Sequence, residues 1–452
     1  MKNYDVIIIG GGPSGIITGV TGKKQNTDKN FLIIKKEEKG LVPCGIPYVF
    51  HDLKDISQNA MGPKPFIDAG GVVLVDEVTE INIVEKTLKT RNNNSFQYEK
   101  LVIATGSTPT IPTFIKGYDL DGVKYIKKSY GYIDDLKKET DEAKNIIVIG
   151  GGFIGVEVAE QLAKFEDKNV SLVEMEEFCL YRAFSKEVAE KANEVISKTN
   201  INLFTNNKIN EIIGENGKVK SVKLASGEEL KADIVIVAVG YKPNTELAIK
   251  AGLEINSNGA IRCDNYLRTI EKDIFAVGDC SQTIGFVTGR TDSIMLASTA
   301  TAEARILGYN LFGIKLLRNF VGTLSVFSTE IGGIVFASAG AIEQSAKYEN
   351  IEYVAGKFTD FDRHPSTMEG AKKIMVKLIV SPRTGNIIGG EMYGGKSVGE
   401  LINIVALAIQ KEVTVYEVIS YQIGTHPLLT TAPTKYVLIK AAEIALEQMN
   451  KE

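Results

Sequence analysis

Cys44 is the strongest candidate for a reactive side chain in this 452-residue sequence. It lies in the segment LVPCGIPYVF, residues 41–50, which follows an apolar stretch and is expected to start a helix. A cysteine at the start of a helix has a lowered pKa, because the helix dipole stabilises the thiolate, and a thiolate can attack a disulfide or reduce a peroxide. This position makes Cys44 a candidate redox thiol. Taken alone, such a cysteine is more simply interpreted as an inert buried thiol, and the context described below reverses that preference.

Cys44 lacks a partner at the C-x4-C spacing of a two-cysteine redox centre. The positions five residues before and after it hold Lys39 and Val49. A single redox cysteine can store electrons only as a sulfenic acid or as a mixed disulfide with a thiol from outside the chain. The sequence thus favours one of these two states.

Two glycine-rich loops, 140 residues apart, each follow a short apolar strand and precede a helix-like segment. In such a loop the first glycine allows a tight turn, the second lets the backbone approach a pyrophosphate, and the third lets helix and strand pack closely. The pyrophosphate then lies at a helix N-terminus, which favours negative charge. One such loop can be purely structural, but two predict two bound dinucleotides between which electrons pass. The loop residues are Gly10, Gly12, Pro13, Ser14 and Gly15, and then Gly150, Gly152, Phe153, Ile154 and Gly155.

Two acidic residues are placed to contact sugar hydroxyls. Glu174 follows Gly155 by 19 residues, at the end of the next apolar strand, where an acid binds the ribose hydroxyls of adenosine. It would repel a 2′-phosphate, so we expect NADH in preference to NADPH. The matching position after the first loop holds Lys35. Asp279 ends a buried strand and could accept a hydrogen bond from a ribityl or ribose hydroxyl, or serve as a helix N-cap.

His426, in the segment GTHPLL, is a candidate proton donor to a thiolate leaving group. An equally good interpretation is a turn histidine whose hydrogen bonds are satisfied. Tyr421 is a second candidate donor. The remaining histidines and cysteines are interpreted as structural, surface or inert: His51, His364, Cys179, Cys263 and Cys280.

The elements that must position these residues form an approximate internal repeat. Each copy runs from a strand through a glycine loop and a helix to a buried strand that ends in a small-residue turn, at residues 101–109 and 234–243. This is the doubly wound βαβ pattern, present twice. A further buried strand ends at Asp279, and a helix is expected at 297–307. From about residue 320, alternating strands (333–339, 374–380, 389–393) and two helices (398–410, 435–448) predict an α+β unit. The fold class is therefore α/β, with two Rossmann-like dinucleotide-binding units and a C-terminal α+β unit.

Composition narrows the class of protein. The chain is 44% apolar with a net charge of −4, and its charged runs mix both signs, so we expect neither nucleic acid nor membrane as a partner. No stretch of 18 apolar residues occurs, and only five residues precede the first strand, which leaves no room for a signal peptide. Four widely spaced cysteines form neither a disulfide framework nor a zinc site. These features predict a cytoplasmic protein that binds no metal.

These motifs together resemble the flavoprotein pyridine nucleotide–disulfide oxidoreductases. Within them, the chain is most similar to the single-cysteine branch: coenzyme A–disulfide reductases, NADH oxidases and peroxidases, and persulfide or sulfur reductases. The resemblance covers essentially the whole chain. The motifs that carry it are residues 10–15, 43–48, 104–106, 150–155 with Glu157, 275–279, and the tail with His426 and Pro427.

The resemblance implies that FAD binds the first loop and NAD(P)H the second. It divides the chain into an FAD-binding domain at 1–112 and 245–318, an NAD(P)H-binding domain at 113–244, and a dimerisation domain at 319–452. A homodimer is implied, with each tail reaching the active site of the partner subunit. Glu157 is implied to lie close to the flavin, and the helix that starts at Ala297 is implied to point its N-terminus at the flavin. The cofactor-binding residues so expected, besides those of the two loops, are Ala104, Thr105, Gly106, Asp279, Ala297, Glu157, Glu174 and Gly240.

Three departures from the family pattern bear on function. The oxidases and peroxidases carry a histidine in the first loop where this chain has Pro13 and Ser14, which disfavours peroxide chemistry. The tail has Thr425 and His426 in place of a tyrosine-rich motif, which favours the persulfide and archaeal-type members. Lys35 replaces the usual ribose acid.

The resulting hypothesis is an enzyme that passes electrons from NADH through FAD to Cys44. Cys44 would rest as a mixed disulfide with a low-molecular-weight thiol, for which coenzyme A is the candidate, and reduce a small disulfide or persulfide. The leaving thiolate would be protonated by His426 of the partner subunit, with Tyr421 as second candidate. Lys23 and Lys24 could meet phosphates of coenzyme A, although a solvated helix face is the simpler explanation for both.

Three alternatives stay open from the sequence. The enzyme could be an NADH oxidase that reduces O2. It could be an electron transferase to a small iron–sulfur protein, which needs no redox thiol. It could also be a non-catalytic sensor that changes its oligomeric state when NADH binds.

Overall fold

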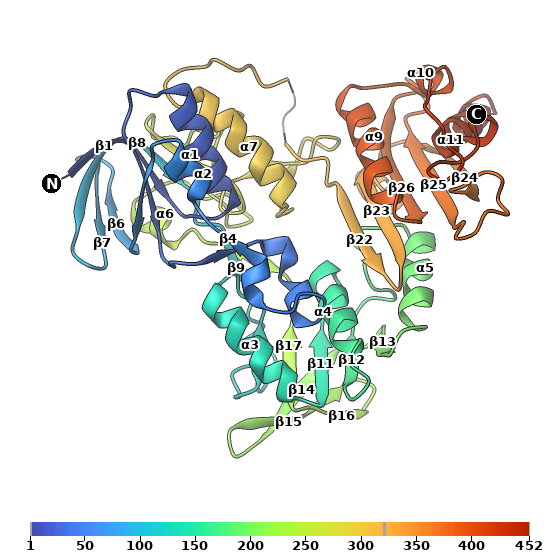
Figure 1. Cartoon of the computed structure of the whole chain (residues 1–452), viewed down its shortest axis with the longest axis horizontal. Helices are drawn as coiled ribbons and strands as arrows, with labels where there is room; N and C mark the ends of the chain where they lie inside the picture. The colour runs from blue at the N-terminus through green and yellow to red at the C-terminus, as the bar shows by residue number, and fades with distance from the viewer. Residues whose placement is uncertain (1, 320–321, 452) are drawn as a thin grey trace.

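The computed structural model describes residues 2–319 and 322–451. In this part of the chain three layered units are each built on their own large sheet (Figure 1). We call them the N-terminal unit, around β1 (Lys2–Ile9), the middle unit, around β11 (Asn145–Ile149), and the C-terminal unit, around β26 (Ile387–Gly394). Figure 1 shows the chain termini on opposite sides of the molecule, in the first and third of these units.

The sheet of the N-terminal unit has the order β5-β2-β1-β8-β7-β6, with β19 also paired to β8. The pairs β1–β2, β1–β8, β2–β5 and β8–β19 are parallel, and β6 and β7 extend the sheet as an antiparallel hairpin. The strands are β2 (Phe31–Lys35), β5 (Val72–Val75), β6 (Val78–Asn82), β7 (Thr87–Thr90), β8 (Ser95–Ile103) and β19 (Ile274–Ala276).

The central strands of this sheet are continuous apolar runs, as expected for parallel strands covered on both faces. Val6, Ile7 and Ile8 are fully buried. Helix α1 (Pro13–Gln25) packs against α7 (Ala297–Asn310), which returns to this unit from a distant part of the chain. A Cβ on Gly308 would lie 2.6 Å from the Cβ of Thr21, so the two helices can approach this closely only because Gly308 has no side chain.

The middle unit repeats the first arrangement. Its sheet has the order β10-β17-β11-β12-β13, and all its pairs are parallel. A small antiparallel sheet, β14-β15-β16, extends it at the edge drawn at the bottom of Figure 1. The elements are β10 (Val123–Tyr125), α3 (Tyr130–Glu142), α4 (Phe153–Ala163), β12 (Asn169–Val173), α5 (Lys186–Ile196), β13 (Ile201–Phe204), β14 (Ile209–Glu215), β15 (Lys218–Leu224), β16 (Glu229–Lys231) and β17 (Ile234–Val237).

The C-terminal unit is an antiparallel sheet with helices, in the order β22-β23-β26-β25-β24. Helix α11 packs on β24 and β25, and α9 on β23 and β26. A Cβ on Gly356 of β24 would lie 1.9 Å from the carbonyl oxygen of Ala441, so a glycine is needed where α11 crosses the strand. The elements are β22 (Phe327–Ile331), β23 (Ile334–Gly340), α8 (Glu343–Tyr348), β24 (Val354–Phe361), β25 (Lys373–Val380), α9 (Val398–Gln410), α10 (Val415–Ile419) and α11 (Val437–Met449).

Short elements lie between the main strands and helices of these units. They are β3 (Gly40–Leu41), η1 (Pro43–Gly45), η2 (Pro47–Phe50), η3 (Ile56–Asn59), β4 (Ala60–Met61), α2 (Lys64–Asp68), β9 (Ser107–Pro109), β18 (Tyr241–Pro243), α6 (Glu246–Lys250), β20 (Thr283–Ile284), β21 (Thr291–Asp292) and η4 (Pro433–Lys435). Strands β3 and β4 pair with each other, as do β9 and β18, and β20 and β21.

The predicted fold class, two Rossmann-like units and a C-terminal α+β unit, is confirmed. Helix α9 matches its predicted range of 398–410, and α7 extends beyond its predicted end at residue 307 to Asn310. Helix α11 starts later than the predicted residue 435, at Val437, and ends at Met449. One detail was wrong: the small-residue turns expected at the ends of the two buried strands contain the paired strands β9 and β18. Strand β5 lies at the sheet edge and is only partly buried. Strands β22 and β24 and the β14–β16 sheet were not foreseen.

The middle and C-terminal units meet through helices α4 and α5. The ring of Phe153, at the start of α4, stacks on Phe327 of β22 with centroids 5.0 Å apart. The carboxylate of Glu391, on β26, is fully buried and accepts a hydrogen bond from the backbone N–H of Ser185, the residue before α5. Lys377 of β25 donates to the Ser185 hydroxyl at 3.2 Å. These contacts hold the sheet of the C-terminal unit against both helices.

Among residues 2–319 and 322–451, the helices are all too short or too polar to cross a lipid bilayer.

Candidate dinucleotide-binding and redox site

The first glycine loop connects β1 to α1 in a geometry that requires its glycines. Gly10 has φ +117°, and a Cβ there would lie 2.1 Å from the carbonyl oxygen of Ala104. A Cβ on Gly15 would lie 2.1 Å from the carbonyl oxygen of Gly10, whereas Gly12 faces open space. Gly12 caps α1 without a side-chain hydrogen bond, and Pro13 follows as the first helical residue. The exposed backbone at Gly12 and the uncapped helix start fit a pyrophosphate.

The second loop has the same geometry between β11 and α4. Gly150 has φ +106°, and its Cβ would lie 2.6 Å from the carbonyl oxygen of Ala238. A Cβ on Gly155 would lie 1.8 Å from the carbonyl oxygen of Gly150, and Gly152 again faces open space. Helix α4 starts at Phe153, next to Ile154, without a side-chain cap. Both loops therefore fit the dinucleotides that the sequence predicts.

The strands after the two loops end in residues of opposite charge. Glu174, directly after β12, is only 9% exposed and accepts hydrogen bonds from the backbone N–H of Gly151 at 2.5 Å and of Glu176 at 2.7 Å. Its carboxylate therefore lies against the second loop. Lys35 is the last residue of β2, and burial lowers its pKa. Its Nζ donates to the carbonyl oxygen of Glu38 at 3.1 Å, so the lysine stays inside the N-terminal unit.

Asp279 follows β19 and is held by two side chains from elsewhere in the chain. Its Oδ2 accepts hydrogen bonds from Ser107 Oγ at 2.7 Å and from Lys128 Nζ at 2.6 Å. Asp279 and Tyr241 also line a small pocket of about 80 Å³, which continues to Met295, two residues before α7. A carboxylate and a pocket in this place fit the hydroxyl-bearing ribityl chain of a flavin.

The turns at Thr105 and Gly240 join the first two units. Thr105 Oγ1 donates to the carbonyl oxygen of Asn244 at 2.6 Å, and Asn244 Nδ2 returns a hydrogen bond to the carbonyl oxygen of Thr105 at 3.0 Å. The backbone N–H of Asn244 donates to the carbonyl oxygen of Gly106, and that of Thr110 to the carbonyl oxygen of Gly240. Hydrogen bonds therefore connect the two expected cofactor-binding turns and fix their positions relative to each other.

The segment around Cys44 belongs to the N-terminal half of the chain but packs on the middle unit. Ile46, Val49 and Phe50 lie in one buried apolar cluster with Val158 and Leu162 of α4. Asp52 extends this contact, because it accepts hydrogen bonds from Lys164 Nζ at 2.8 Å and from Gln161 Nε2 at 3.1 Å. His51 bonds to Asp52 and packs edge-on against Phe165, which makes it structural, as expected.

The predicted state of the Cys44 thiol was wrong. Cys44 is exposed, but it lies in η1, a three-residue 3-10 helix, and not at the N-terminus of an α-helix. Desolvation by the surrounding protein raises its pKa, and the negative charge of Glu157 adds to this effect. The positive charge of Lys128 lowers the pKa of Cys44, and the negative charge of Asp279 raises it. Cys44 therefore lies within the electric field of residues from both candidate cofactor sites.

Glu157 lies on α4, one turn after the second loop. Burial is the main cause that raises its pKa to about 7, and the nearby Glu160 contributes. Thr329 Oγ1 of β22 donates to Glu157 Oε1 at 2.8 Å, and the backbone N–H of Gly332 donates to Glu160 Oε1 at 2.6 Å. Burial and the charge of Glu157 also raise the pKa of Tyr48, which places this carboxyl near the segment that carries Cys44. Glu157 can therefore hold a proton at neutral pH.

His426 and Tyr421 lie on an exposed loop of the C-terminal unit. The hydrogen bonds described for His426 are made within its own loop, with Leu428, Leu429 and Thr430. Tyr421 is 41% exposed. Within one chain the structure therefore does not bring either residue into contact with Cys44. His364 Nδ1 donates a hydrogen bond to the carbonyl oxygen of Thr430 at 3.0 Å, consistent with a structural role.

The structure agrees with neither interpretation of Lys23, the favoured solvated helix face or the alternative contact with coenzyme A phosphates. Lys23 is buried, and its Nζ donates to the carbonyl oxygens of Thr27 and Lys29 at 2.7 and 2.8 Å, just beyond the C-terminus of α1. Lys24 is exposed.

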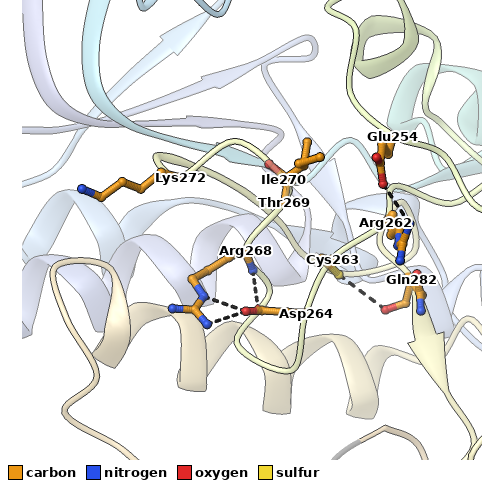
Figure 2. Close-up of a pocket in the computed structure, with 9 residues that line it drawn as sticks. All are labelled: Glu254, Arg262, Cys263, Asp264, Arg268, Thr269, Ile270, Lys272 and Gln282. Carbon is orange, nitrogen blue, oxygen red and sulfur yellow. Dashed lines mark hydrogen bonds and ion pairs between the residues drawn. The ribbon is translucent and has the colours of Figure 1, made fainter.

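A second pocket, of about 630 Å³, lies apart from these groups (Figure 2). Four of its charged residues form two ion pairs, Arg262 with Glu254 at 3.0 Å and Arg268 with Asp264. Figure 2 shows Cys263 facing Gln282, and burial raises the pKa of this thiol to about 12. Cys179 and Cys280 are fully buried, so the three cysteines besides Cys44 have the environment of inert thiols.

Three residues of the site were not found by sequence reasoning: Ser107, Lys128 and Thr329. Ser107 stands in a small-residue turn, Lys128 in a run of two lysines, and Thr329 in an unrecognised strand. None of them belongs to a short motif, and each becomes relevant only through a partner more than 100 residues away.

Comparisons with known proteins define the class. Residues 4–304 match the family described as pyridine nucleotide-disulphide oxidoreductase, and residues 328–437 match its dimerisation domain. The chain belongs to this family of flavin-dependent oxidoreductases. The dimerisation domain supports a homodimer, and the family binds FAD and NAD(P)H.

Two curated relatives and one solved structure are similar over most of their length. The chain is 31% identical to an NADH oxidase of Methanocaldococcus jannaschii, over 99% of each protein. It is 30% identical to the NAD(P)H coenzyme A polysulfide/persulfide reductase of Pyrococcus horikoshii, over 86% of this chain and 87% of that one. The structure of an NAD-dependent persulfide reductase from A. fulgidus superposes with a TM-score of 0.91 at 29% identity, over 99% of this chain and 84% of that one. The chain is thus an NAD(P)H oxidoreductase of the persulfide reductase, coenzyme A–disulfide reductase and NADH oxidase group.

Proposed function

We propose that this enzyme uses NADH to reduce a low-molecular-weight disulfide or persulfide, with Cys44 as its redox thiol and coenzyme A as the thiol class. One observation carries the proposal. Cys44 is exposed to an incoming substrate, while Glu157 of the second loop's helix and Asp279 of the candidate flavin site act on its thiol. In the described residues, the other cysteines are buried or partly buried, so the second sulfur must come from the substrate.

The proposed reaction consumes one disulfide or persulfide from outside the chain at each turnover. The Cys44 thiolate attacks one sulfur of a disulfide RSSR, a Cys44–SR bond forms, and RS⁻ leaves and takes up a proton. The two electrons of the hydride from NADH then cleave the mixed disulfide to the Cys44 thiolate and a second RS⁻. The balance is NADH + RSSR + H⁺ → NAD⁺ + 2 RSH, and a persulfide RSSH gives RSH and hydrogen sulfide in the same way.

FAD, when bound, would accept the hydride of NADH and pass its two electrons to sulfur. Its pyrophosphate would lie at Gly12, Pro13 and Ser14, and a hydroxyl of its ribityl chain would share Asp279 with Ser107. The start of α7 at Ala297, which has no side-chain cap, would meet the flavin. The turn of Ala104, Thr105 and Gly106 would line the same site.

The second loop with Gly240 and Glu174 would hold NADH. The carboxylate of Glu174 lies against the backbone of Gly151, where it accepts the ribose hydroxyls and repels a 2′-phosphate. This geometry supports NADH in preference to NADPH.

The proton donor would come from the second subunit. His426 and Tyr421 lie within the matched dimerisation domain, next to the exposed side chains of Leu428 and Leu429. In a homodimer this loop would be covered, and His426 of the partner subunit would protonate the leaving thiolate. Nδ1 of His426 accepts a hydrogen bond from the N–H of Leu428, so the neutral ring carries its proton on Nε2.

The domain division expected from the family fits these assignments. We assign residues 1–112 and 245–318 to FAD binding, 113–244 to NAD(P)H binding and 319–452 to dimerisation. The pairing of β19 with β8 and the packing of α7 on α1 support the return of the chain to the first domain.

Intact-protein mass spectrometry, with and without a thiol reductant, tests the proposal. The oxidised enzyme should carry one reductant-sensitive adduct of coenzyme A mass, absent in Cys44→Ser and present in the matched control Cys263→Ser. Cys44→Ser should lose at least about 100-fold in NADH-dependent reduction of coenzyme A disulfide, because the nucleophile is gone, and Cys263→Ser should keep it. Full disulfide reduction by Cys44→Ser would refute the proposal.

The similarity to the M. jannaschii protein named NADH oxidase favours a second candidate function, reduction of O2. An NADH oxidase should show O2 uptake with NADH alone, and Cys44 should then gain one to three oxygens and no thiol adduct. Unchanged O2 uptake in Cys44→Ser would mean that the thiol does not store the electrons. Comparable NADH oxidation with a small iron–sulfur protein as acceptor, independent of Cys44, would instead support electron transfer.

A further inference from the structure

The loop between β12 and α5 reaches from the second glycine loop to the C-terminal unit. We call residues 179–185 of this loop the connecting segment; they form neither helix nor strand. At the start of the segment, the backbone N–H of Leu180 donates to the carbonyl oxygen of Gly151 at 2.8 Å. A Cβ on Gly151 would lie 2.6 Å from the sulfur of Cys179, so the segment packs directly on the glycine loop. The conformation of Gly151 therefore depends on the position of this segment.

Side chains of the C-terminal unit hold the other end of the connecting segment. Ser338 Oγ of β23 donates to the carbonyl oxygen of Ala183 at 2.9 Å. Gln344 Nε2 of α8 donates to the carbonyl oxygen of Phe184 at 2.9 Å. The next residue, Ser185, is bonded to the same unit through both its N–H and its hydroxyl. Side chains from a distant part of the chain thus satisfy the backbone groups of consecutive residues.

An aromatic contact follows the same route. The ring of Phe184 is fully buried and meets the ring of Phe153 edge-on, with centroids 6.0 Å apart. It also meets the ring of Phe336, on β23, with centroids 6.3 Å apart. Phe153 is the first residue of α4 and belongs to the second glycine loop. The connecting segment therefore joins this loop to the C-terminal unit by packing as well as by hydrogen bonds.

The connecting segment needs these anchors because its backbone is strained. Leu180 has φ +59°, in the left-handed region that a residue other than glycine seldom occupies. Such a conformation persists only where the surrounding structure fixes it. Without the anchors at Ala183 and Phe184, the segment would spend part of its time away from Gly151. A ligand that requires the ordered loop then binds more weakly, in proportion to the fraction of molecules that are ordered.

We propose that Ser338 and Gln344 are positioning residues of the NADH site: they hold the connecting segment against the second glycine loop, so that the C-terminal unit sets the affinity for the dinucleotide. The inference rests on the proposed binding of NADH at this loop. It gives the dimerisation domain a role in nucleotide binding in addition to subunit association.

Calorimetric titration of the flavin-containing enzyme with ADP-ribose tests the inference. ADP-ribose has the pyrophosphate and ribose that the loop would hold but lacks the nicotinamide, so binding is measured without turnover. Gln344→Met and Ser338→Ala each remove one donor to the connecting segment. Each should weaken binding about threefold, and the double variant about tenfold. With ferricyanide as acceptor, the KM for NADH should rise by the same factors while kcat stays unchanged.

Ser345→Ala is the matched control. Ser345 follows Gln344 on α8, and its hydroxyl bonds to the backbone of Ile342 inside the C-terminal unit. Loss of this cap destabilises the same unit without removing a donor to the connecting segment. The affinity for ADP-ribose should therefore remain that of the unmodified enzyme.

Alkylation of Cys179 by N-ethylmaleimide, located by peptide mass spectrometry, measures the position of the segment itself. This thiol is fully buried against the glycine loop, so it reacts only when the segment moves away. Gln344→Met and Ser338→Ala should each raise the alkylation rate about threefold, and saturating ADP-ribose should lower it again. Ser345→Ala should react at the rate of the unmodified enzyme.

Unchanged ADP-ribose affinity in both Gln344→Met and Ser338→Ala would overturn the inference. An equal loss of affinity in Ser345→Ala would also overturn it, since general loosening of the C-terminal unit would then explain the effect. Weaker binding without faster alkylation of Cys179 would exclude the connecting segment as the route. Failure of the unmodified enzyme to bind ADP-ribose would reject the proposed NADH site itself. Failure to reduce coenzyme A disulfide, with the expected binding results, would reject only the proposed acceptor.

Discussion

Thr329 Oγ1 donates a 2.8 Å hydrogen bond to Glu157 Oε1 and so joins β22 of the C-terminal unit to α4, the helix that starts at the second glycine loop. The carboxyl that receives it is mostly desolvated and has a pKa of about 7. This hydrogen bond lowers the pKa of Glu157 against the effect of burial. The C-terminal unit therefore sets the charge of a carboxyl beside the candidate redox site.

Thr329→Val should raise the pKa of Glu157 further, because the charged form loses its hydrogen-bond donor. We expect any pH dependence of NADH oxidation that reports this group to move up by about 1 unit from pH 7. The measurement is the pH profile of turnover with ferricyanide, an acceptor that bypasses Cys44. Thr329→Ser keeps the hydroxyl and should restore the original profile, and identical profiles for both variants would contradict the prediction.

Glu157→Gln should make the stability of the protein less dependent on pH. Burial raises the folded-state pKa of Glu157 from 4.5 to about 7, so between these values the folded protein holds a proton that the unfolded chain has released. The resulting stabilisation is complete below about pH 4.5 and is lost as the pH rises through 7. The unmodified protein should lose about 2–3 kcal/mol of unfolding free energy from this group between about pH 5 and pH 8, and the variant should not show that loss. Urea unfolding at both pH values measures this, and an equal difference at the two would exclude it.

Glu174→Gln should weaken the discrimination against NADPH. The substituted side chain keeps an oxygen that can accept from the N–H of Gly151, but it loses the negative charge that repels a 2′-phosphate. We expect the ratio of kcat/KM for NADPH to that for NADH to rise about tenfold, equivalent to about 1.4 kcal/mol. Glu194→Gln, in an exposed ion-pair cluster on α5, is the control and should leave the ratio unchanged. If both variants keep the original ratio, Glu174 does not select the nucleotide.

Leu429→Glu should disrupt the homodimer. Leu429 is 67% exposed in the isolated chain and lies three residues after His426, so a charge there would be buried on association. We expect light scattering to detect a monomer that has lost reduction of coenzyme A disulfide but retains turnover with ferricyanide. The conservative Leu429→Met should remain dimeric and active. A dimeric, fully active Leu429→Glu would remove this loop from the interface.

The residues that sequence reasoning placed well are those whose role is local. The spacing of Gly10, Gly12 and Gly15 is enough to predict a strand, a turn and a helix, because the contacts of these residues lie mostly within the same βαβ unit. Glu174 was placed correctly at the end of its strand for the same reason.

The residues that sequence reasoning missed depend on partners far away in the chain. Asp279 was found, but Lys128, 151 residues away in the chain, was not, since no pattern in a pair of lysines distinguishes the one that contacts a carboxylate. The pKa of Cys44 was predicted with the wrong sign because η1 is not an α-helix, and because the burial that raises the pKa comes from long-range packing. Rules that use only neighbouring residues cannot predict this desolvation.

The packing of residues 41–56 into the core of the middle unit has a practical consequence. Ile46, Val49 and Phe50 share their apolar cluster with Val158 and Leu162. The domain boundary expected at residue 112 would nevertheless assign the two groups to different domains. A chimera that takes its flavin domain from one relative and its nucleotide domain from another would therefore cut through a hydrophobic core. A functional chimera of two relatives should therefore take residues 41–56 and α4 from the same parent protein.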